Sequence, residues 1–139
     1  MKAEPNGRKP FQFRLDVQSG VPVYRQIIDQ VTGGLAAGTL RGGDQLATVR
    51  QLAVDLAINP NTVIRAYREL EIRGVLETQQ GTGTFISHRK PKRDDAERQR
   101  RLAQIAGEAA ARAGAEGFSV DELIERLETM GIESERKGR

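Results

Sequence analysis

Polar side chains suited to reading DNA bases recur along one side of a helix predicted near the middle of the chain. The stretch from Asn59 to Gly74 reads Asn-Pro-Asn-Thr-Val-Ile-Arg-Ala-Tyr-Arg-Glu-Leu-Glu-Ile-Arg-Gly. At about 100° per residue, Asn61, Arg65 and Arg68 fall on the same side of that helix. Arginine and asparagine carry paired hydrogen-bonding groups that match base edges in the major groove of DNA. This spacing predicts a DNA-contacting face, although an ordinary solvated surface helix has the same pattern.

The sequence also contains signals for both ends of this helix and an apolar stripe on its opposite side. Asn59 is suited to cap the helix, and Pro60 fits the first helical position because its missing N–H would be unsatisfied there. Gly74 supplies the stop, since glycine adopts the left-handed cap at little cost. The apolar stripe consists of Val63, Ala66, Tyr67 and Leu70. We expect this stripe to hold the helix on a core.

Two further helices are predicted before it. Pro22 opens the first and Gly38 ends it, with apolar residues at three- and four-residue steps. Thr48 and Gln51 form a capping-box pattern at the start of the second, which is shorter. The expected buried stripes are Tyr24, Ile27, Ile28, Val31 and Leu35 in the first and Val49, Leu52, Ala53 and Leu56 in the second. The break at residues 57–58 lacks glycine, and it joins the second helix to the polar-faced helix in the proportions of a helix-turn-helix.

Extended segments are predicted on both sides of these helices. Residues 1–20 read as a flexible arm, in which Phe11, Phe13, Leu15 and Val17 alternate and are expected to lie on the domain. Residues 39–46 read as a turn leading into a short strand.

Two short strands, residues 75–79 and 84–87, are predicted after Gly74 because β-branched and aromatic residues flank a glycine-containing turn. The turn consists of Gln80, Gly81, Thr82 and Gly83. Strands directly after a helix-turn-helix form a wing, and glycines let its tip approach a phosphate backbone closely. The glycine spacing also suggests a dinucleotide-binding loop, but that motif opens a helix and here a strand follows.

A basic linker, residues 89–93, leads to two predicted helices. The first ends near Gly114, and the second runs from a Ser119–Glu122 capping box to Gly131. Their candidate dimerisation residues are Leu102, Ile105, Ala109, Leu123, Ile124, Leu127 and Met130. Two helices span too little chain to form a core of their own, so we expect a second copy of the chain to cover them. The alternative is that both fold back onto the N-terminal domain.

The composition excludes several kinds of chemistry. There is no cysteine, which excludes disulfides, thiolate metal sites and cysteine nucleophiles. The single histidine, His88, is expected to be solvated rather than a general base. The carboxylates of Asp94, Asp95 and Glu97 fit a helix N-terminus better than a metal site. No run approaches the roughly 20 apolar residues of a membrane span. We expect a cytoplasmic protein that is not an enzyme and has no cofactor.

Charge is only a mild argument for a polyanionic partner. The net charge is +3, from 22 basic and 19 acidic residues. Residues 21–88 carry as many acidic as basic side chains, so DNA contact there depends on where the arginines point. This neutrality supports an alternative function, a winged-helix module used for protein–protein contacts.

The stretch from Pro22 to Ser87 resembles the GntR family of transcriptional regulators. The most specific parts are Leu46–Ala53, which reads Leu-Ala-Thr-Val-Arg-Gln-Leu-Ala, and the Asn-Pro-Asn-Thr-Val start of the polar-faced helix with its Arg-Ala-Tyr. That start and the short tail are similar to the YtrA subfamily, whose members usually lack a full effector-binding domain. Ala47, Pro60 and Ile64 depart from the broad family pattern, which commonly has a proline at the first position and arginines at the other two.

The resemblance implies a set of DNA contacts. Arg50 would touch phosphate or base, Asn59, Asn61 and Thr62 would lie at the groove end of the helix, and the wing would meet the minor groove. Because arginines are missing at positions 60 and 64, we assign the base contact to Arg65 and then Arg68. The predicted DNA-binding residues are Arg50, Asn59, Asn61, Thr62, Arg65, Arg68, Gln80, Gly81, Thr82 and Gly83.

The expected fold is mainly α with a small β wing (α+β). It comprises an arm (1–20), a winged helix-turn-helix domain (21–88), a basic linker (89–93) and a helical dimerisation tail (94–139). The expected function is that of a dimeric DNA-binding repressor on an inverted-repeat operator of double-stranded DNA. An unidentified small-molecule effector would bind at the dimer interface or between the domain and the tail.

Overall fold

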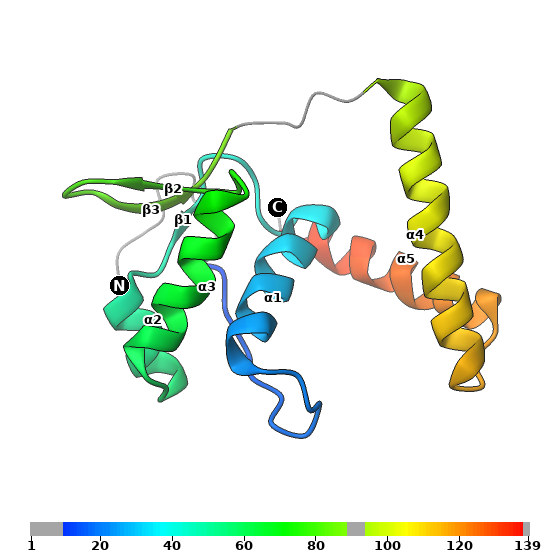
Figure 1. Ribbon diagram of the computed structural model, residues 1–139, viewed down its shortest axis with the longest axis horizontal. Coiled ribbons are helices and arrows are strands. Elements are labelled where there is room, and N and C mark those ends of the chain that lie inside the picture. The colour runs from blue at the N-terminus through cyan, green and yellow to red at the C-terminus, as the bar shows by residue number, and fades with distance from the viewer. Residues whose placement is uncertain (1–9, 89–93, 138–139) are drawn as a thin grey trace. The chain divides into compact units, whose positions relative to one another are not determined.

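The computed structural model describes residues 10–88 and 94–137, with side chains described as far as Gly131. It divides into two units, which are taken separately: one holds α1 to β3, and the other holds α4 and most of α5 (Figure 1). The elements are α1 (Val23–Ala37), β1 (Gln45–Leu46), α2 (Val49–Leu56), α3 (Pro60–Ile72), β2 (Leu76–Gln79), β3 (Gly83–Ile86), α4 (Asp95–Ala115) and α5 (Val120–Lys137). The start of the expected arm, residues 1–9, and the basic linker 89–93 lie outside the described residues.

In the first unit α3 is the central element, because it packs against α1, α2 and β2. Its apolar stripe is buried as predicted, and Val63, Ala66 and Leu70 have no exposed surface. Burying one such aliphatic side chain is worth about 1.5 to 3 kcal/mol. The rest of the core consists of Tyr67, also on α3, and of side chains from the neighbouring segments: Phe13, Ile27, Ile28, Val31, Leu40, Leu46, Leu52, Ala53, Leu76 and Ile86.

The helix ends confirm most of the predicted signals. The Asn59 side chain accepts a hydrogen bond from the Asn61 N–H at 2.8 Å, which caps α3. Gly74 adopts a left-handed φ of 78°, and Val75 N–H donates to Leu70 O at 2.8 Å, so α3 ends in a Schellman motif. At α2 only half of the capping box forms: Thr48 Oγ1 accepts from the Gln51 N–H.

The sheet is larger than the predicted wing. β2 and β3 form the expected antiparallel hairpin, with Gln79 opposite Gly83, but β1 adds a third strand on the other side of β3. Gln45 pairs with Phe85 and Leu46 with Thr84, so the strand before the helix-turn-helix anchors the wing. These helices and this three-stranded sheet confirm the predicted mainly α winged helix-turn-helix fold.

The arm lies along α1 through two glutamine side chains. Gln30 accepts from the Arg14 N–H at 2.8 Å and donates to the Arg14 carbonyl, and Gln26 makes the same pair of bonds with Asp16. Phe13 is buried as expected, with Phe11 edge-on against it at a ring-centroid distance of 4.9 Å. The prediction for Val17 was wrong, because the chain turns there and leaves its side chain 89% exposed.

In the second unit both helices begin as predicted. Asp94 caps α4 by accepting from the N–H groups of Ala96 and Glu97, and Ser119 and Glu122 form both bonds of a capping box. The predicted end at Gly131 was wrong, since α5 continues to Lys137. An exposed glycine weakens a helix by about 1 kcal/mol relative to alanine but keeps its backbone N–H. The good helix formers after it are sufficient to carry the helix on.

Candidate nucleic-acid interface

The polar and apolar sides of α3 are separated as the sequence predicted. Tyr67 is buried on the inner side, and its hydroxyl donates to the Ala47 carbonyl at 2.7 Å. Burial raises the pKa of the Tyr67 phenol above its ordinary value, so the group stays a neutral donor. Ala47 directly precedes the cap of α2, so this bond fixes α3 relative to the start of α2.

The outer side of α3 presents Asn61, Ile64, Arg65 and Arg68, all of which are exposed. Their spacing of three and four residues places them on one face. The first carboxylate along α3 is that of Glu69, which pairs with Arg73 at 2.9 Å. The N-terminal two turns of α3 therefore offer amide and guanidinium groups with no acidic side chain among them, which suits a negatively charged ligand.

Arg65 contacts an aromatic side chain of α1. Its guanidinium carbon lies 3.7 Å from the centre of the Tyr24 ring. Tyr24, Asn61 and Arg65 share the lining of two adjoining surface hollows, the larger of about 630 Å³, which extends to Arg68. The predicted base-reading arginine is thus seated on α1, a contact that the sequence did not reveal.

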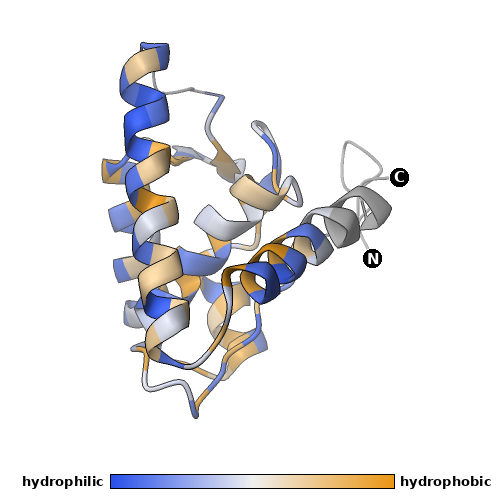
Figure 2. Ribbon diagram, turned by 90° about the vertical axis from the view of Figure 1, so that its right-hand side faces the viewer, coloured by the Kyte–Doolittle hydropathy of each residue, from blue (hydrophilic) through white to orange (hydrophobic). Residues whose placement is uncertain are grey.

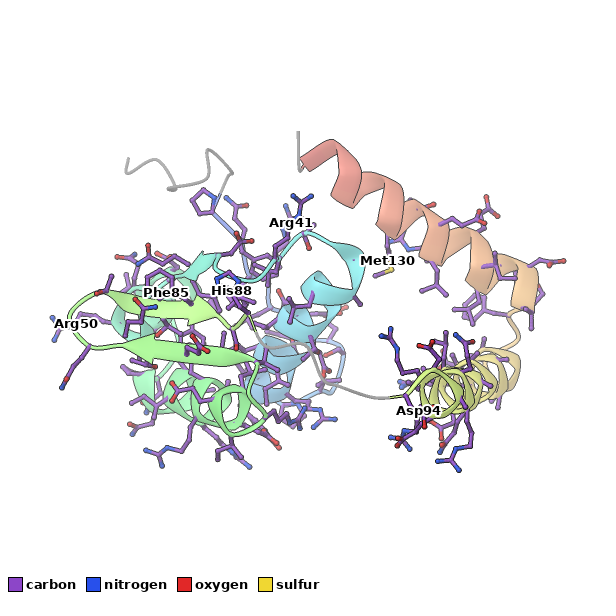
Figure 3. All side chains as sticks on the ribbon, turned by 90° about the horizontal axis from the view of Figure 1, so that it is seen from above. Arg41, Arg50, Phe85, His88, Asp94 and Met130 are labelled. Atoms are coloured by element: carbon purple, nitrogen blue, oxygen red, sulfur yellow. The ribbon has the colours of Figure 1, made fainter. Side chains whose placement is uncertain are left out.

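The remaining predicted residues of the helix-turn-helix lie close to its turn. Asn59 is exposed, but its side-chain oxygen is occupied by the cap of α3, whereas Thr62 is half-buried. Arg50, in the first turn of α2, is exposed and lies at the outer edge of the domain (Figure 3). The turn itself places Ala57 in a left-handed conformation, with φ 54° and ψ 48°.

The tip of the wing is exposed and carries no charge. Gln80, Gly81 and Thr82 project from the hairpin, and Thr82 N–H closes the turn on Gln79 O at 3.0 Å. Gly81 has a left-handed φ of 79°. Amides, a hydroxyl and free backbone are groups that can hydrogen-bond to phosphate or to a minor-groove edge.

Gln45 supports the wing from β1. Its side-chain amide donates to the Thr82 carbonyl at 3.2 Å. A Cβ at Gly83, which has φ 136°, would lie only 2.7 Å from that amide nitrogen. Glycine at this position therefore permits both the backbone conformation and the close approach of Gln45.

The predicted dimerisation residues form an exposed apolar surface on the second unit. Figure 2 shows apolar positions interleaved with hydrophilic ones along α4 and α5. Exposed fractions are 58% for Leu102, 57% for Ile105, 46% for Ile124, 55% for Leu127 and 42% for Met130, while Ala109 and Leu123 are half-buried. No residue of α4 is buried. Within the described part of the chain, these helices have apolar faces without a core.

Other kinds of site find no support in the described residues. No group of histidine, cysteine or carboxylate side chains there could hold a metal ion, and His88 is exposed. No helix among residues 10–88 and 94–137 is long and apolar enough to cross a membrane. The sequence reasoning missed Tyr24 and Gln45, because it placed Tyr24 in an apolar stripe and could not foresee the pairing of β1 with β3.

Comparison with known proteins agrees with this geometry. Residues 23–86 match the model of "Bacterial regulatory proteins, gntR family". The chain is 46% identical over 75 residues to the HTH-type transcriptional repressor YtrA of Bacillus subtilis, a match that spans 54% of this chain and 58% of that protein.

Two solved structures are also similar. YtrA from Sulfolobus acidocaldarius, a GntR-family transcription factor, is 29% identical with a TM-score of 0.52, covering 70% of this chain and 97% of that one. A transcriptional regulator from Oenococcus oeni is 32% identical with a TM-score of 0.54, covering 86% of this chain and 98% of that one. The second match is longer than the winged domain alone and so extends into the helical tail.

Proposed function

We propose that the chain, whose residues 23–86 belong to the GntR family of bacterial regulatory proteins, is a sequence-specific DNA-binding repressor acting as a dimer on an inverted-repeat operator. Its matched relatives are named as transcriptional regulators, which agrees with the expectation that it is not an enzyme. The observation that carries the proposal is the outward face of α3, where Asn61, Arg65 and Arg68 are exposed and the nearest carboxylate along the helix, that of Glu69, is paired with Arg73. We place the regulator in the cytoplasm.

In the proposed complex α3 enters the major groove and the wing meets the minor groove. The major groove admits a helix, and Arg65 and Arg68 have the donor geometry to pair with guanine O6 and N7, as Asn61 does with adenine N6 and N7. Arg50, in the first turn of α2, contacts a phosphate. The uncharged wing tip binds through amides and backbone groups.

The proposed dimer forms through α4 and α5. Exposed apolar side chains on adjacent helices favour burial against a matching surface, and most soluble oligomers are symmetric homodimers. A two-fold dimer would place two copies of α3 in successive major grooves about 34 Å apart. That spacing accounts for an inverted repeat as the operator.

The decisive experiment is selection of bound DNA from a random pool, followed by titration of the selected operator. Arg65→Ala is expected to weaken the selected site by about 1 to 3 kcal/mol, or about 5- to 150-fold, and to relax the preference at one base pair of each half-site. Arg73→Ala is the matched control, because that arginine lies at the far end of α3 in an ion pair with Glu69. Enrichment of no sequence by the wild type would reject the proposal.

The dimer is tested separately by sedimentation of the full chain. Leu127→Asp places a charge on the apolar face of α5 and is expected to give a monomer with weaker operator binding, whereas Glu128→Ala at the neighbouring exposed position should not. A wild-type monomer at binding concentrations would contradict the dimer.

A second candidate is a winged-helix module for protein–protein contacts. It is favoured by the equal numbers of acidic and basic side chains in residues 21–88. Gel shifts against competitor DNA separate the two functions, since a protein–protein module shows no sequence preference.

A small-molecule effector, bound at the dimer interface or between the domain and the tail, is also part of the proposal. A thermal-shift screen of the full chain against small metabolites would look for it, and tight binding to residues 10–88 alone would count against the expected site.

A further inference from the structure

Arg65 lies over an aromatic ring, while its hydrogen-bonding groups are unused within the described part of the chain. The guanidinium carbon is 3.7 Å from the centre of the Tyr24 ring. Among the described residues, no hydrogen-bond or ion-pair partner of the guanidinium is found. Arg68, one turn further along the same face, has no such ring contact within that part of the chain. The two exposed arginines of the DNA-facing side are therefore held differently.

Stacking of this kind suits a group that must pair with a base edge. A guanidinium is planar, and its N–H donors lie in that plane, so a ring on one face leaves the donors at the rim free. An arginine side chain also loses rotamer entropy when it is fixed, and a ring contact partly meets that cost before the ligand arrives. Cation–π contact thus orients Arg65 without consuming its donors.

The ring itself is firmly placed. Tyr24 is half-buried and packs against the hydrophobic core, to which its own helix contributes the fully buried Ile27 and Ile28. Its hydroxyl makes no hydrogen bond to any described residue. The aromatic face is therefore the part of Tyr24 that the structure uses, and it links α1 to the face of α3 that carries Asn61 and Arg65.

We propose that Tyr24 is the positioning residue for Arg65, holding its guanidinium on α1 so that its paired donors meet a guanine edge in the major groove. This inference rests on the proposed function. It assigns to α1 a part in sequence recognition, whereas Arg68 reads or touches DNA without such support. Loss of the ring should therefore affect only the base position that Arg65 reads.

The test is a double-mutant cycle on the selected operator at fixed salt, with the full chain. Tyr24→Leu, which keeps an apolar side chain but removes the π face, is expected to weaken binding about two- to fivefold. Tyr24→Phe keeps the ring and should restore most of the loss. In an Arg65→Ala background Tyr24→Leu should have no further effect, whereas in an Arg68→Ala background its full effect should persist.

A second measurement uses the free protein. The ring should shift the Arg65 side-chain resonances upfield, and this shift should disappear in Tyr24→Leu and remain in Tyr24→Phe. Equal losses of affinity for Tyr24→Phe and Tyr24→Leu, or additive effects of Tyr24→Leu and Arg65→Ala, would overturn the positioning role alone. Selection of no sequence by the wild type would overturn the proposed function and this inference together.

Discussion

Removing one oxygen atom, by Tyr67→Phe, tests how α3 is held in place for its proposed task. The Tyr67 hydroxyl donates to the Ala47 carbonyl at 2.7 Å, and the side chain is only 2% exposed. Phenylalanine keeps the ring and its packing against the core. The substitution therefore isolates the bond that ties α3 to the segment preceding α2.

The expected loss of stability depends on the Ala47 carbonyl, which the substitution leaves without its hydrogen-bond donor. A typical buried hydrogen bond contributes about 0.5 to 1.5 kcal/mol net, and a carbonyl left without its donor costs about 1 to 3 kcal/mol. Because Ala47 is only half-buried, partial access of water to its carbonyl reduces the cost of leaving that carbonyl without a donor. We expect a loss of about 1 to 2 kcal/mol in the free energy of unfolding. For a domain of this size that lowers Tm by about 4 to 16 °C.

The assay is urea unfolding followed by far-ultraviolet circular dichroism. Tyr24→Phe is the matched control, because the same atom is removed from a hydroxyl that has no partner among the described residues. Wild type and control should unfold at the same midpoint, and Tyr67→Phe should unfold at a lower one with an unchanged slope. Equal midpoints for the two variants would refute the structural role given to the Tyr67 hydroxyl.

Three further outcomes are expected. Because burial raises the pKa of Tyr67 in the folded state, the stability it contributes is complete below about pH 10 and falls above it by at most about 1.4 kcal/mol per pH unit. Tyr67→Phe should flatten that fall in unfolding curves between pH 9 and 11. Ala57→Gly should raise stability by about 1 kcal/mol, since the left-handed conformation of Ala57 costs an L-residue that much. By the same urea assay, Gly83→Ala should cost about 1 to 3 kcal/mol, and Gly81→Ala, where added atoms meet open space, should cost less.

The parts of the structure that the sequence predicted are those governed by neighbours along the chain. The span of α3 follows from Asn59, Pro60 and Gly74, and each acts within a few residues of itself. The division of α3 into a buried and an exposed side follows from the helical period alone. Both were correct because local signals and tertiary packing favour the same structure here.

The features that the sequence did not predict depend on residues distant in the chain. The pairing of Gln45 with Phe85 and the contact of Tyr24 with Arg65 each require elements whose relative placement no local pattern specifies. Periodicity placed Tyr24 in an apolar stripe, and its half-buried ring is consistent with that prediction, yet the exposed face of the same ring carries the contact. At Gly131 a local signal was itself misleading: the isolated glycine was interpreted as a helix stop, but α5 continues through it to Lys137.

The neutral net charge of the winged domain does not weigh against a DNA partner when the positions and partners of its carboxylates are considered. Every acidic side chain of residues 21–88 has a partner within the domain: Asp29 pairs with Arg25, Asp44 with the Arg41 N–H, Asp55 with Gln51, Glu69 with Arg73, Glu71 with Thr78 and Glu77 with Ser87. In contrast, Arg50, Arg65 and Arg68 form no ion pair within the described residues. Among the described residues of the domain, only Asp29 and Glu69 are paired with arginine side chains, and α3 carries no carboxylate before Glu69. The first turns of the proposed interface therefore hold Arg65 without a carboxylate beside it, although the charges of residues 21–88 sum to zero.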